Sequence, residues 1–290
     1  ILADDLGYGD VGVYGCKDVP TPHIDSIAKN GVRFTNGYAD HPVCSPSRAG
    51  LMAGRYQQRF GFEHNSGPER FASPKFGVPR SVPILAEKLK RAGYATAVAG
   101  KWQLALMKKD LQQPRRLGFD KWSVFGWHEG ARFHDPMIYQ NGKIRNNLKG
   151  RYGPEIYVEF LSAFMERSHK GNKPFFAYYS MALAHDVTDD LKWQVPYVPG
   201  KDRWMNYGEM IESMDATVGK LMATLDRLGI RKDTVVIFTG DNGTAARSKL
   251  RHLGKKGGKY EYEKVVVTRN GQQIAGGKGS LKDTGTHVPL

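Results

Sequence analysis

The alternation of apolar, strand-like runs with amphipathic helices is the feature that most constrains the fold of this 290-residue chain. Three short runs are almost continuously apolar, as strands that are buried on both faces must be. These predicted strands are Ala95–Ala99, Phe175–Tyr179 and Thr234–Phe238. Helical periodicity fills Val82–Ala92, Pro154–Ser168 and Glu209–Leu228. The pattern predicts an α/β fold whose large, mostly parallel central sheet is covered by helices on both faces.

The chain is expected to form one domain that spans residues 1–290. No internal repeat or low-complexity linker divides the sequence, and its length suits one large α/β domain. Ile1–Ala3 is interpreted as the end of a strand already under way, and His287–Leu290 as the approach to another one. We therefore expect the sequence to be cut at both ends from a longer protein, with any export signal upstream of it.

Polar residues follow the predicted strands at the points where chemistry collects in a parallel sheet. Ligands and catalytic groups in such folds gather beyond the carboxyl ends of the strands. Four distant segments supply candidates for this edge, namely Asp4 with Asp5, Lys101, His185, and Asp241 with Asn242. The topology alone therefore predicts that these side chains lie close together.

Asp4, Asp5, Asp241 and Asn242 offer carboxylate and amide oxygens as metal ligands. Hard oxygen ligands favour Ca²⁺ or Mg²⁺ over Zn²⁺. An Asp-rich turn and an Asp-Asn-Gly turn are each common without a metal, so either pair alone would be weak evidence. Both pairs together, in a chain that also carries the cysteine motif described next, predict a divalent metal site.

The stretch Cys44-Ser45-Pro46-Ser47-Arg48 combines a nucleophile precursor with groups that attract anions. Ser45 is predicted to be the N-cap of a helix and Pro46 its first residue. The cysteine then sits at a helix N-terminus, where backbone N–H groups and the dipole favour anions. Arg48 lies about one turn further along and can reach the same spot. The alternative is a buried cysteine before an ordinary helix.

The charge of the chain points to an anionic partner. With 43 Lys and Arg against 29 Asp and Glu, the formal net charge is +14. Nucleic acid, an anionic membrane or a sulfated polymer would suit this excess, but no nucleic-acid-binding signature is present in the sequence. No apolar run approaches the ~18 residues that a membrane span needs. Cys16 and Cys44 are not expected to pair, because a disulfide would block the nucleophile; Cys16 is interpreted as a structural or surface thiol.

Two Asn-Gly pairs and one basic segment are interpreted as decorations of the sheet. Asn141-Gly142 and Asn270-Gly271 each predict a β-hairpin. The segment Arg247–Lys264 is rich in Lys and Arg and is predicted to be a solvated, mobile loop. The alternative is a cationic lip over the active-site edge that gathers anionic polymer.

The cysteine motif resembles the C-x-P-x-R signature of the sulfatases, a family of the alkaline-phosphatase-like superfamily. Further motifs follow in the family's order, namely Asp4-Asp5, Thr21-Pro22-His23-Ile24-Asp25, Gly100-Lys101-Trp102, Thr239-Gly240-Asp241-Asn242-Gly243 and Gly276-Gly277-Lys278-Gly279. The resemblance covers essentially the whole chain. It implies a three-layer α/β sandwich, with residues 1–290 as the N-terminal catalytic domain and a smaller C-terminal subdomain absent.

The resemblance also implies a mechanism. Cys44 would be oxidised to formylglycine by a maturation enzyme, and the hydrated aldehyde would attack the sulfur of a sulfate ester. It implies Ca²⁺, with Mg²⁺ as the second candidate, bound by Asp4, Asp5, Asp241, Asn242 and the oxidised side chain at position 44. Arg48, Lys101 and Lys278 would surround the transferring group with positive charge. His185 would hold sulfate and help protonate the leaving oxygen.

The chain departs from the family pattern at Gln103. The family usually reads Gly-Lys-Trp-His-Leu-Gly where this chain reads Gly-Lys-Trp-Gln-Leu-Ala. Glutamine can donate or accept a hydrogen bond but cannot take a proton near neutral pH. We expect Gln103 to bind substrate beside Lys101, His185 and Lys278, and regeneration of the aldehyde to be slower or served by another base.

Three further histidines are not assigned to the chemistry. His287 lies in Thr284-Gly285-Thr286-His287, a second departure from the family pattern, and is interpreted as structural. His128 and His134 could line the substrate pocket, but mid-loop histidines more often have no specific role.

The predicted function is hydrolysis of a sulfuric ester on a sulfated carbohydrate, in an exported protein of the periplasm, the extracellular space or a lysosome-like compartment. The nearest alternative is a phosphodiesterase or phosphonate monoester hydrolase of the same superfamily. An alternative of another class is a catalytically dead polyanion-binding protein whose Cys44 is never converted, with Gln103 as a sign of decay.

Overall fold

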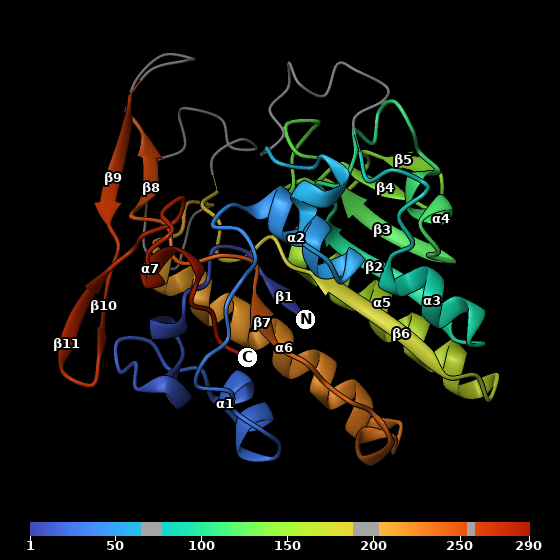
Figure 1. The fold of residues 1–290 in the computed structure, drawn as a ribbon, viewed down its shortest axis with the longest axis horizontal. Coiled ribbons are helices and arrows are strands. Elements are labelled where there is room, and N and C mark those ends of the chain that lie inside the picture. Colours follow the sequence, from blue (N-terminus) through green and yellow to red (C-terminus); the bar gives the residue numbers. More distant parts are fainter. Residues whose placement is uncertain (65–76, 188–202, 254–258) are drawn as a thin grey trace.

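The computed structural model describes residues 1–64, 77–187, 203–253 and 259–290. Within these ranges, a seven-stranded sheet of order β5-β4-β3-β2-β6-β1-β7 forms the centre (Figure 1). Its strands are Leu2–Ala3 (β1), Ala95–Lys101 (β2), Lys121–Phe125 (β3), Ile138–Gln140 (β4), Lys143–Arg145 (β5), Phe175–Ser180 (β6) and Thr239–Gly240 (β7). Strands β3, β2, β6, β1 and β7 run parallel, and only the edge strands β4 and β5 pair antiparallel. The predicted mostly parallel sheet is confirmed.

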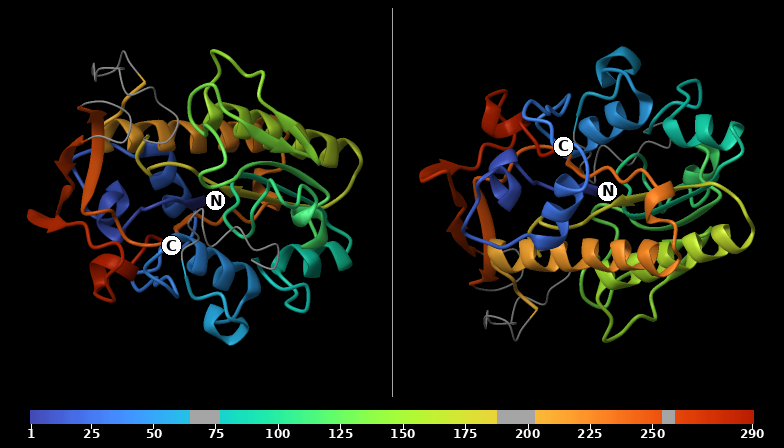
Figure 2. Two further views of the ribbon diagram at one scale, coloured as in Figure 1. Left: turned by 90° about the horizontal axis from the view of Figure 1, so that it is seen from above. Right: turned by 90° about the horizontal axis from the view of Figure 1, so that it is seen from below.

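Helices cover both faces of this sheet, which makes three layers (Figure 2). The helices are Pro22–Lys29 (α1), Cys44–Ala53 (α2), Leu85–Arg91 (α3), Gln113–Arg116 (α4), Gly153–Lys170 (α5), Tyr207–Arg227 (α6) and Asp283–Thr286 (α7). Short 3₁₀ turns lie at Tyr8–Asp10, Gly12–Tyr14, Gln57–Phe60 and Arg231–Asp233. Helices α5 and α6 lie on one side of the sheet, and α2 and α3 lie on the other.

Two hydrophobic clusters, one on each side of the sheet, follow from the alternation of side chains along its strands. In β2, Ala97 and Ala99 belong to the cluster under α5 and α6, whereas Val98 belongs to the cluster under α2 and α3. Successive strand residues point to opposite faces, so a strand covered on both sides must be apolar throughout. This is why near-continuous apolar runs could predict β2 and β6.

The three predicted helices are present, with one shifted start. Helix α6 begins at a capping box in which the Glu209 backbone N–H donates to Asn206 Oδ1 at 2.8 Å and the Asn206 N–H donates to Glu209 Oε2 at 2.8 Å. The helix predicted to start at Val82 starts instead at Leu85. Pro83 explains why Val82 is not helical, because the residue before a proline is disfavoured in the helical conformation, and Ile84, with an extended backbone, is the N-cap.

The strand predicted at Thr234–Phe238 is wrong, because ladder pairing starts only at Thr239. Strand β1 contributes two residues to this ladder, and they pair with Thr239 and Gly240. Ile1 is the first residue of the sequence, and its ammonium group donates to Ile237 O at 2.7 Å, so β1 has no further residue beside 234–236. Val235 is 86% exposed and Ile237 57% exposed.

The two Asn-Gly hairpins are confirmed, and the basic segment is more ordered than predicted. Asn141-Gly142 joins β4 to β5, and Asn270-Gly271 joins Val266–Arg269 (β10) to Gln272–Ala275 (β11). All four turn residues have positive φ, as this type of tight turn requires. The segment predicted to be a mobile loop forms a third hairpin, with Arg247–His252 (β8) antiparallel to Tyr260–Lys264 (β9). Residues 254–258 between them lie outside the described ranges.

A search of the described helices finds none with the length and apolar character that crossing a membrane would require.

Candidate active site

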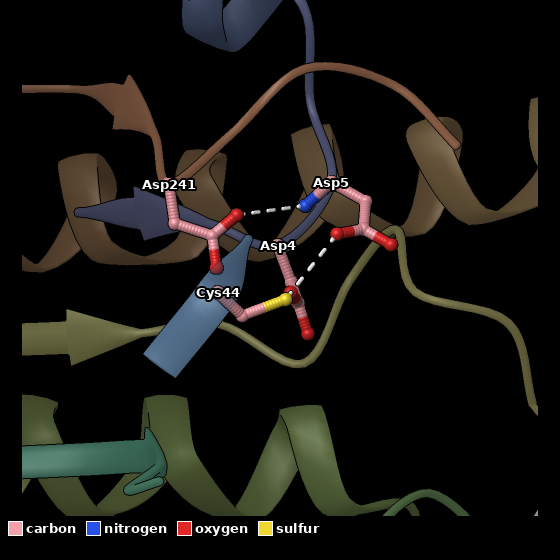
Figure 3. Close-up of side chains that lie close together, drawn as sticks. All are labelled: Asp4, Asp5, Cys44 and Asp241. Atoms are coloured by element: carbon pink, nitrogen blue, oxygen red, sulfur yellow. Dashed lines mark hydrogen bonds between the residues drawn. The ribbon is translucent and has the colours of Figure 1, made fainter. Parts of the chain in front are cut away.

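An acidic cluster with a cysteine at its centre lies at the carboxyl edge of the sheet (Figure 3). Asp4 and Asp5 follow β1, Asp241 follows β7, and Cys44 comes from the start of α2. One ligand atom from each of these four buried residues lies within 4.8 Å of the others. Cys44 Sγ is 3.4 Å from Asp4 Oδ1 and 3.5 Å from Asp5 Oδ1. The structure thus brings together Asp4, Asp5 and Asp241, as the topology predicted, and places Cys44 among them.

Helix α2 starts two residues earlier than its sequence predicted. Val43, not Ser45, is the N-cap, and Cys44 is the first helical residue. The Ser47 N–H donates to Val43 O at 3.3 Å, which closes the first turn around the cysteine. Cys44 is therefore within the first turn, where the helix dipole is most positive. Both Cys44 and Cys16 are buried free thiols, as expected.

Arg48, one helical turn after Cys44, contacts two carboxylates of the cluster. Its Nε donates to Asp241 Oδ2 at 2.8 Å, and its second terminal nitrogen lies 2.7 Å from the same oxygen and 3.4 Å from Asp4 Oδ1. The remaining terminal nitrogen donates to Ser180 Oγ, which itself donates to Lys101 O at 2.6 Å. Only 1% of the arginine is exposed, so its donors are fixed toward the site.

Lys101 and Lys278 approach the cluster from its two sides. Lys101 Nζ donates to both carboxylate oxygens of Asp4, at 2.9 and 2.7 Å. Lys278 Nζ lies 2.7 Å from Asp5 Oδ2. Each of the two adjacent carboxylates thus has its own cation, and both lysines are near Cys44, as the sequence predicted.

The buried charges shift the pKa values of the cluster in different directions. Burial alone would raise the pKa of Asp4, but Lys101 and Arg48 outweigh it and hold the pKa below its usual range. Burial opposes Lys278 at Asp5 in the same way, and the pKa of Asp5 is again lowered. Burial prevails at Asp241, where it raises the pKa to about 6 despite Arg48. Burial also raises the pKa of the Cys44 thiol well above its ordinary value.

Asn242 completes a set of oxygen ligands suited to a divalent cation. Its Nδ2 donates to Asp5 Oδ1 at 2.9 Å, while its Oδ1 is buried without a hydrogen-bond partner among the described residues. A buried unpaired carbonyl oxygen is costly unless something binds it. Its place beside Asp5 and Asp241 suits a hard cation, so the residues present fit Ca²⁺ or Mg²⁺.

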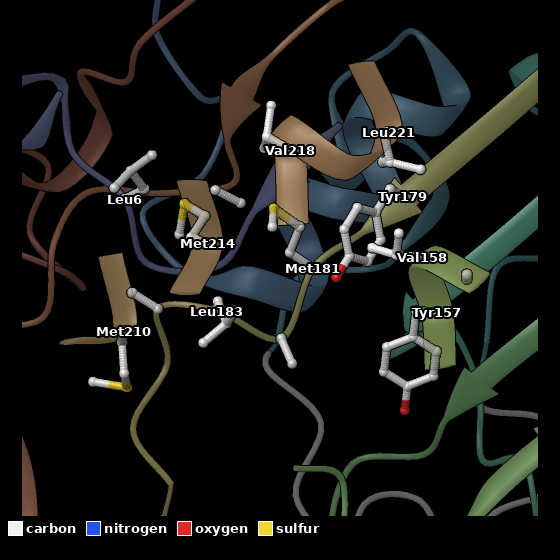
Figure 4. Packing of buried hydrophobic residues seen from close by; sticks show 14 of the residues in the cluster. Leu6, Tyr157, Val158, Tyr179, Met181, Leu183, Met210, Met214, Val218 and Leu221 are labelled. Carbon is white, nitrogen blue, oxygen red and sulfur yellow. The ribbon is translucent and has the colours of Figure 1, made fainter. Parts of the chain in front are cut away.

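The loop that carries His185 is tied to β1 and packed against α6. The Asp4 N–H donates to Leu183 O at 2.8 Å, and the Ala184 N–H donates to Asp4 O at 2.7 Å. Leu183 is buried in the same hydrophobic cluster as Met210 of α6 (Figure 4). The loop therefore holds His185 beside the acidic cluster, with Nδ1 3.4 Å from Asp186 Oδ1.

Sequence reasoning missed three residues around His185. The His185 and Trp127 ring centroids are 4.9 Å apart, and Lys101 Nζ and the Arg132 guanidinium each lie 4.5 Å from the Trp127 ring. Arg132 is only 2% exposed and donates to Asp186 O at 3.1 Å. Asp186 could have been suspected because it directly follows His185, but Trp127 and Arg132 stand in a loop without any motif.

The structure also shows the surroundings of Gln103 and of the three histidines that the sequence left unassigned. Gln103 is fully buried two residues after Lys101, with a left-handed φ of 47°. His287 stacks on Tyr8 at 3.9 Å, a packing contact consistent with its structural interpretation. The His128 ring lies 4.9 Å from Trp127, and the His134 ring lies 5.1 Å from Tyr152.

The parallel sheet and the cluster at its carboxyl edge define an alkaline-phosphatase-like α/β protein. The Sulfatase family model matches residues 1–290, and the chain belongs to the sulfatase family. The chain is 33% identical over 283 residues to N-acetylgalactosamine-6-sulfatase of Rattus norvegicus, which covers 89% of this chain and 52% of that protein. It is 31% identical over 284 residues to arylsulfatase A of Bos taurus, with 89% and 54% covered.

A solved structure described as that of Ps i-CgsB matches the fold with a TM-score of 0.75 and 26% identity. The match covers 100% of this chain and 63% of that chain. The chain thus spans about half the length of the curated relatives that it matches.

Proposed function

We propose that this protein hydrolyses sulfate esters of a sulfated carbohydrate. The observation that carries the proposal is the Cys44 side chain, which lies within 3.5 Å of two carboxylates at a helix N-terminus. Three buried or half-buried cations, Arg48, Lys101 and Lys278, surround this point. Ps i-CgsB supports a carbohydrate substrate, because a second structure of it, 28% identical to this chain, is a complex with k-i-k-neocarrahexaose.

A divalent metal is part of the proposal, with Ca²⁺ as the first candidate and Mg²⁺ as the second. Asp4, Asp5, Asp241 and Asn242 would hold it, together with the oxidised side chain at position 44. When bound, the metal would neutralise sulfate oxygens and make the nucleophile more acidic. The lowered pKa values of Asp4 and Asp5 keep both carboxylates ionised, as metal ligands must be.

Position 44 is proposed to become formylglycine through a maturation enzyme, and its hydrate would supply a hydroxyl nucleophile toward sulfur. The chain's own residues then position the ester. Arg48 is locked by Asp241 and Ser180, so it can face the anion without reorganising. Lys101 and Lys278 would contact sulfate oxygens from two sides, with Gln103 as a further substrate contact.

His185 is proposed to donate the proton that the leaving sugar oxygen needs. Asp186 lies beside its Nδ1 and can fix the orientation of the ring. Trp127 packs against the same ring, so His185 has support from two elements. General acid catalysis of this kind typically contributes 10²–10⁴-fold to a rate.

The domain and the compartment are also proposals. Residues 1–290 would be the catalytic domain, with a smaller C-terminal subdomain beyond it, since the curated relatives are about twice as long as the matched region. An exported location, in the periplasm, outside the cell or in a lysosome-like compartment, would suit a sulfated glycan substrate.

The test is a parallel assay of the matured protein on aryl sulfate, aryl phosphate and aryl phosphonate esters, followed by a panel of sulfated saccharides. Sulfate esters are expected to turn over fastest; preference for phosphate or phosphonate would favour the sister activities of the superfamily. Mass spectrometry of the Cys44 peptide should show loss of H₂S and gain of O. An unmodified thiol and no turnover would favour a polyanion-binding protein.

Cys44→Ala should abolish turnover and leave the fold intact, and Cys16→Ala is the matched control. Both cysteines are free and buried, but only Cys44 touches the acidic cluster. Retained activity in Cys44→Ala would remove the nucleophile from the proposal, whereas lost activity in both variants would point to a general effect on folding.

A further inference from the structure

The β8–β9 hairpin carries two like charges directly opposite each other. Arg247 of β8 pairs in register with Lys264 of β9, and both side chains are exposed. Like charges at opposed positions destabilise a pair of strands. The glutamates of β9 do not offset them: Glu261 forms an ion pair with Arg251 at 2.5 Å, and Glu263 accepts the Tyr207 N–H at 2.5 Å.

A third cation lies on the same face of the hairpin. Lys249 is two residues after Arg247, so the alternation of the strand puts it on the same side, and its Nζ lies 4.9 Å from the Tyr260 ring. The opposite face holds Ser248, which is buried, and Glu263. Among the described residues, Arg247, Lys249 and Lys264 form no ion pair with a carboxylate.

The base of the hairpin is joined to the candidate active site. The Lys249 N–H donates to Asp186 Oδ2 at 3.3 Å, and the other oxygen of Asp186 is 3.4 Å from His185 Nδ1. The Lys278 N–H donates at 2.9 Å to the carbonyl of Thr244, which precedes β8. The hairpin stands at one side of the molecule and is continuous in the chain with Asn242 at one end and Lys278 at the other (Figure 1).

We propose that Arg247, Lys249 and Lys264 bind a second anionic group of the substrate, a sulfate on a sugar neighbouring the one whose ester is cleaved. The inference rests on the proposed function and specifies its substrate class: an oligosaccharide that carries more than one sulfate. A bound sulfate places negative charge between Arg247 and Lys264 and so removes their repulsion. The arginine adds donors whose geometry matches sulfate oxygens.

The test compares binding of two synthetic hexasaccharides, one sulfated on every sugar and one with a single terminal sulfate. The variant is Arg247→Gln with Lys264→Gln, in a Cys44→Ala background that prevents turnover, studied by calorimetry at low ionic strength. The matched control, Lys121→Gln with Lys143→Gln, removes two exposed charges from β3 and β5. Both pairs change the net charge equally.

The hairpin variant is expected to bind the fully sulfated hexasaccharide about tenfold more weakly, as loss of two charge-assisted contacts implies. Its affinity for the singly sulfated one should change less than about twofold. Its thermal stability should be unchanged or higher, since a repulsive pair is removed. An equal loss in the control, or equal wild-type affinity for both hexasaccharides, would overturn the proposal.

Failure of the proposed function would look different. If the wild-type protein hydrolyses no sulfate ester but binds the fully sulfated hexasaccharide, and only the hairpin variant binds it more weakly, the catalytic proposal is contradicted. The proposed binding surface is then supported. If the wild-type protein cleaves a singly sulfated ester, and the hairpin variant binds both hexasaccharides as tightly as the wild type does, only the proposed binding surface is contradicted.

Discussion

Asp5 and Lys278 form a 2.7 Å ion pair although 273 positions separate them in the sequence. Asp5 follows the first strand, and Lys278 lies in the glycine-rich turn after β11. The backbone also holds this turn, because the Lys278 N–H donates to Thr244 O at 2.9 Å. The lysine is thus positioned by the chain itself and by its carboxylate partner, which explains how a lysine in a flexible sequence context reaches a buried cluster.

Removal of the charge of Asp241 should weaken metal binding and stability together. Asp241→Asn keeps the shape, but among the described residues it leaves buried Arg48 with only Asp4, at 3.4 Å, as a carboxylate partner. We expect at least tenfold weaker Ca²⁺ binding by calorimetry at pH 8, above the Asp241 pKa of about 6. Loss of one partner of a buried pair should also cost roughly 3 kcal/mol in metal-free unfolding. The control is Asp233→Asn, which changes an exposed aspartate. Full metal affinity in Asp241→Asn would contradict the role of Asp241 as a ligand.

The contribution of Asp10 to the stability of the protein should decrease as the pH rises from about 4 to about 6. Burial raises the pKa of Asp10 to about 6, although Thr244, Tyr207 and the Gly7 N–H donate to its carboxylate. The folded state therefore holds a proton that the unfolded state, with a pKa of about 4, releases first. The contribution of Asp10 is most favourable below pH 4 and is lost as pH rises through 6, by roughly 3 kcal/mol.

Urea unfolding of wild-type protein and Asp10→Asn across this range checks the prediction. The free energy of unfolding of the wild-type protein should fall relative to that of Asp10→Asn as the pH rises from 4 to 6. Above pH 6 the difference should stay constant. Parallel curves would show that Asp10 is not the group responsible.

Gly100 should be far less tolerant of alanine than Gly229, although both have positive φ. A Cβ on Gly100 would lie 1.9 Å from Ser180 O, whereas nothing lies within 4 Å of one on Gly229. Gly229→Ala should cost only the left-handed conformation, about 1 kcal/mol. Gly100→Ala should cost more than about 3 kcal/mol in urea unfolding, because β2 and β6 must separate. Similar costs at both sites would show that φ alone governs Gly100.

Gln103→His should raise the turnover of sulfate ester by the matured protein. The residue is fully buried two residues after Lys101, and a histidine there could accept a proton that glutamine cannot. The measurement is kcat with saturating substrate across pH 5–9, with Gln103→Asn as a control that also cannot accept a proton. An unchanged rate in Gln103→His would mean that another group already serves as the base.

The parts of this fold that depend on local periodicity could be predicted, and the parts that depend on pairing partners could not. Strands β2 and β6 are buried on both faces, so their sequences alone revealed them. Residues 234–238 have the same apolar character, but β1 supplies only Leu2 and Ala3 as ladder partners, and these pair with Thr239 and Gly240. The pairing of β8 with β9 in the basic segment 247–264 was not predicted, because a sequence pattern does not say which residues face each other across a hairpin.

The candidate site was predictable to the extent that its residues occupy motifs or strand ends. Asp4, Asp5 and Asp241 meet because parallel strands end at a common edge, and Cys44 joins them from the first turn of α2. Arg132 and Trp127 could not be foreseen, because a long loop brings them to His185 and nothing local marks their burial. Ser180, which links Arg48 to the backbone of Lys101, was also missed, although it is the last residue of strand β6.

The matched charges of the cluster couple the binding of a metal ion to the binding of an anion. Among the described side chains, the carboxylates of Asp4, Asp5 and Asp241 are matched one for one by Arg48, Lys101 and Lys278. A divalent ion that enters such an electroneutral cluster leaves it with two surplus positive charges, and a bound anion reduces this surplus. Ion and anion should therefore each tighten the other's hold, and by thermodynamic reciprocity the two effects must be equal in size.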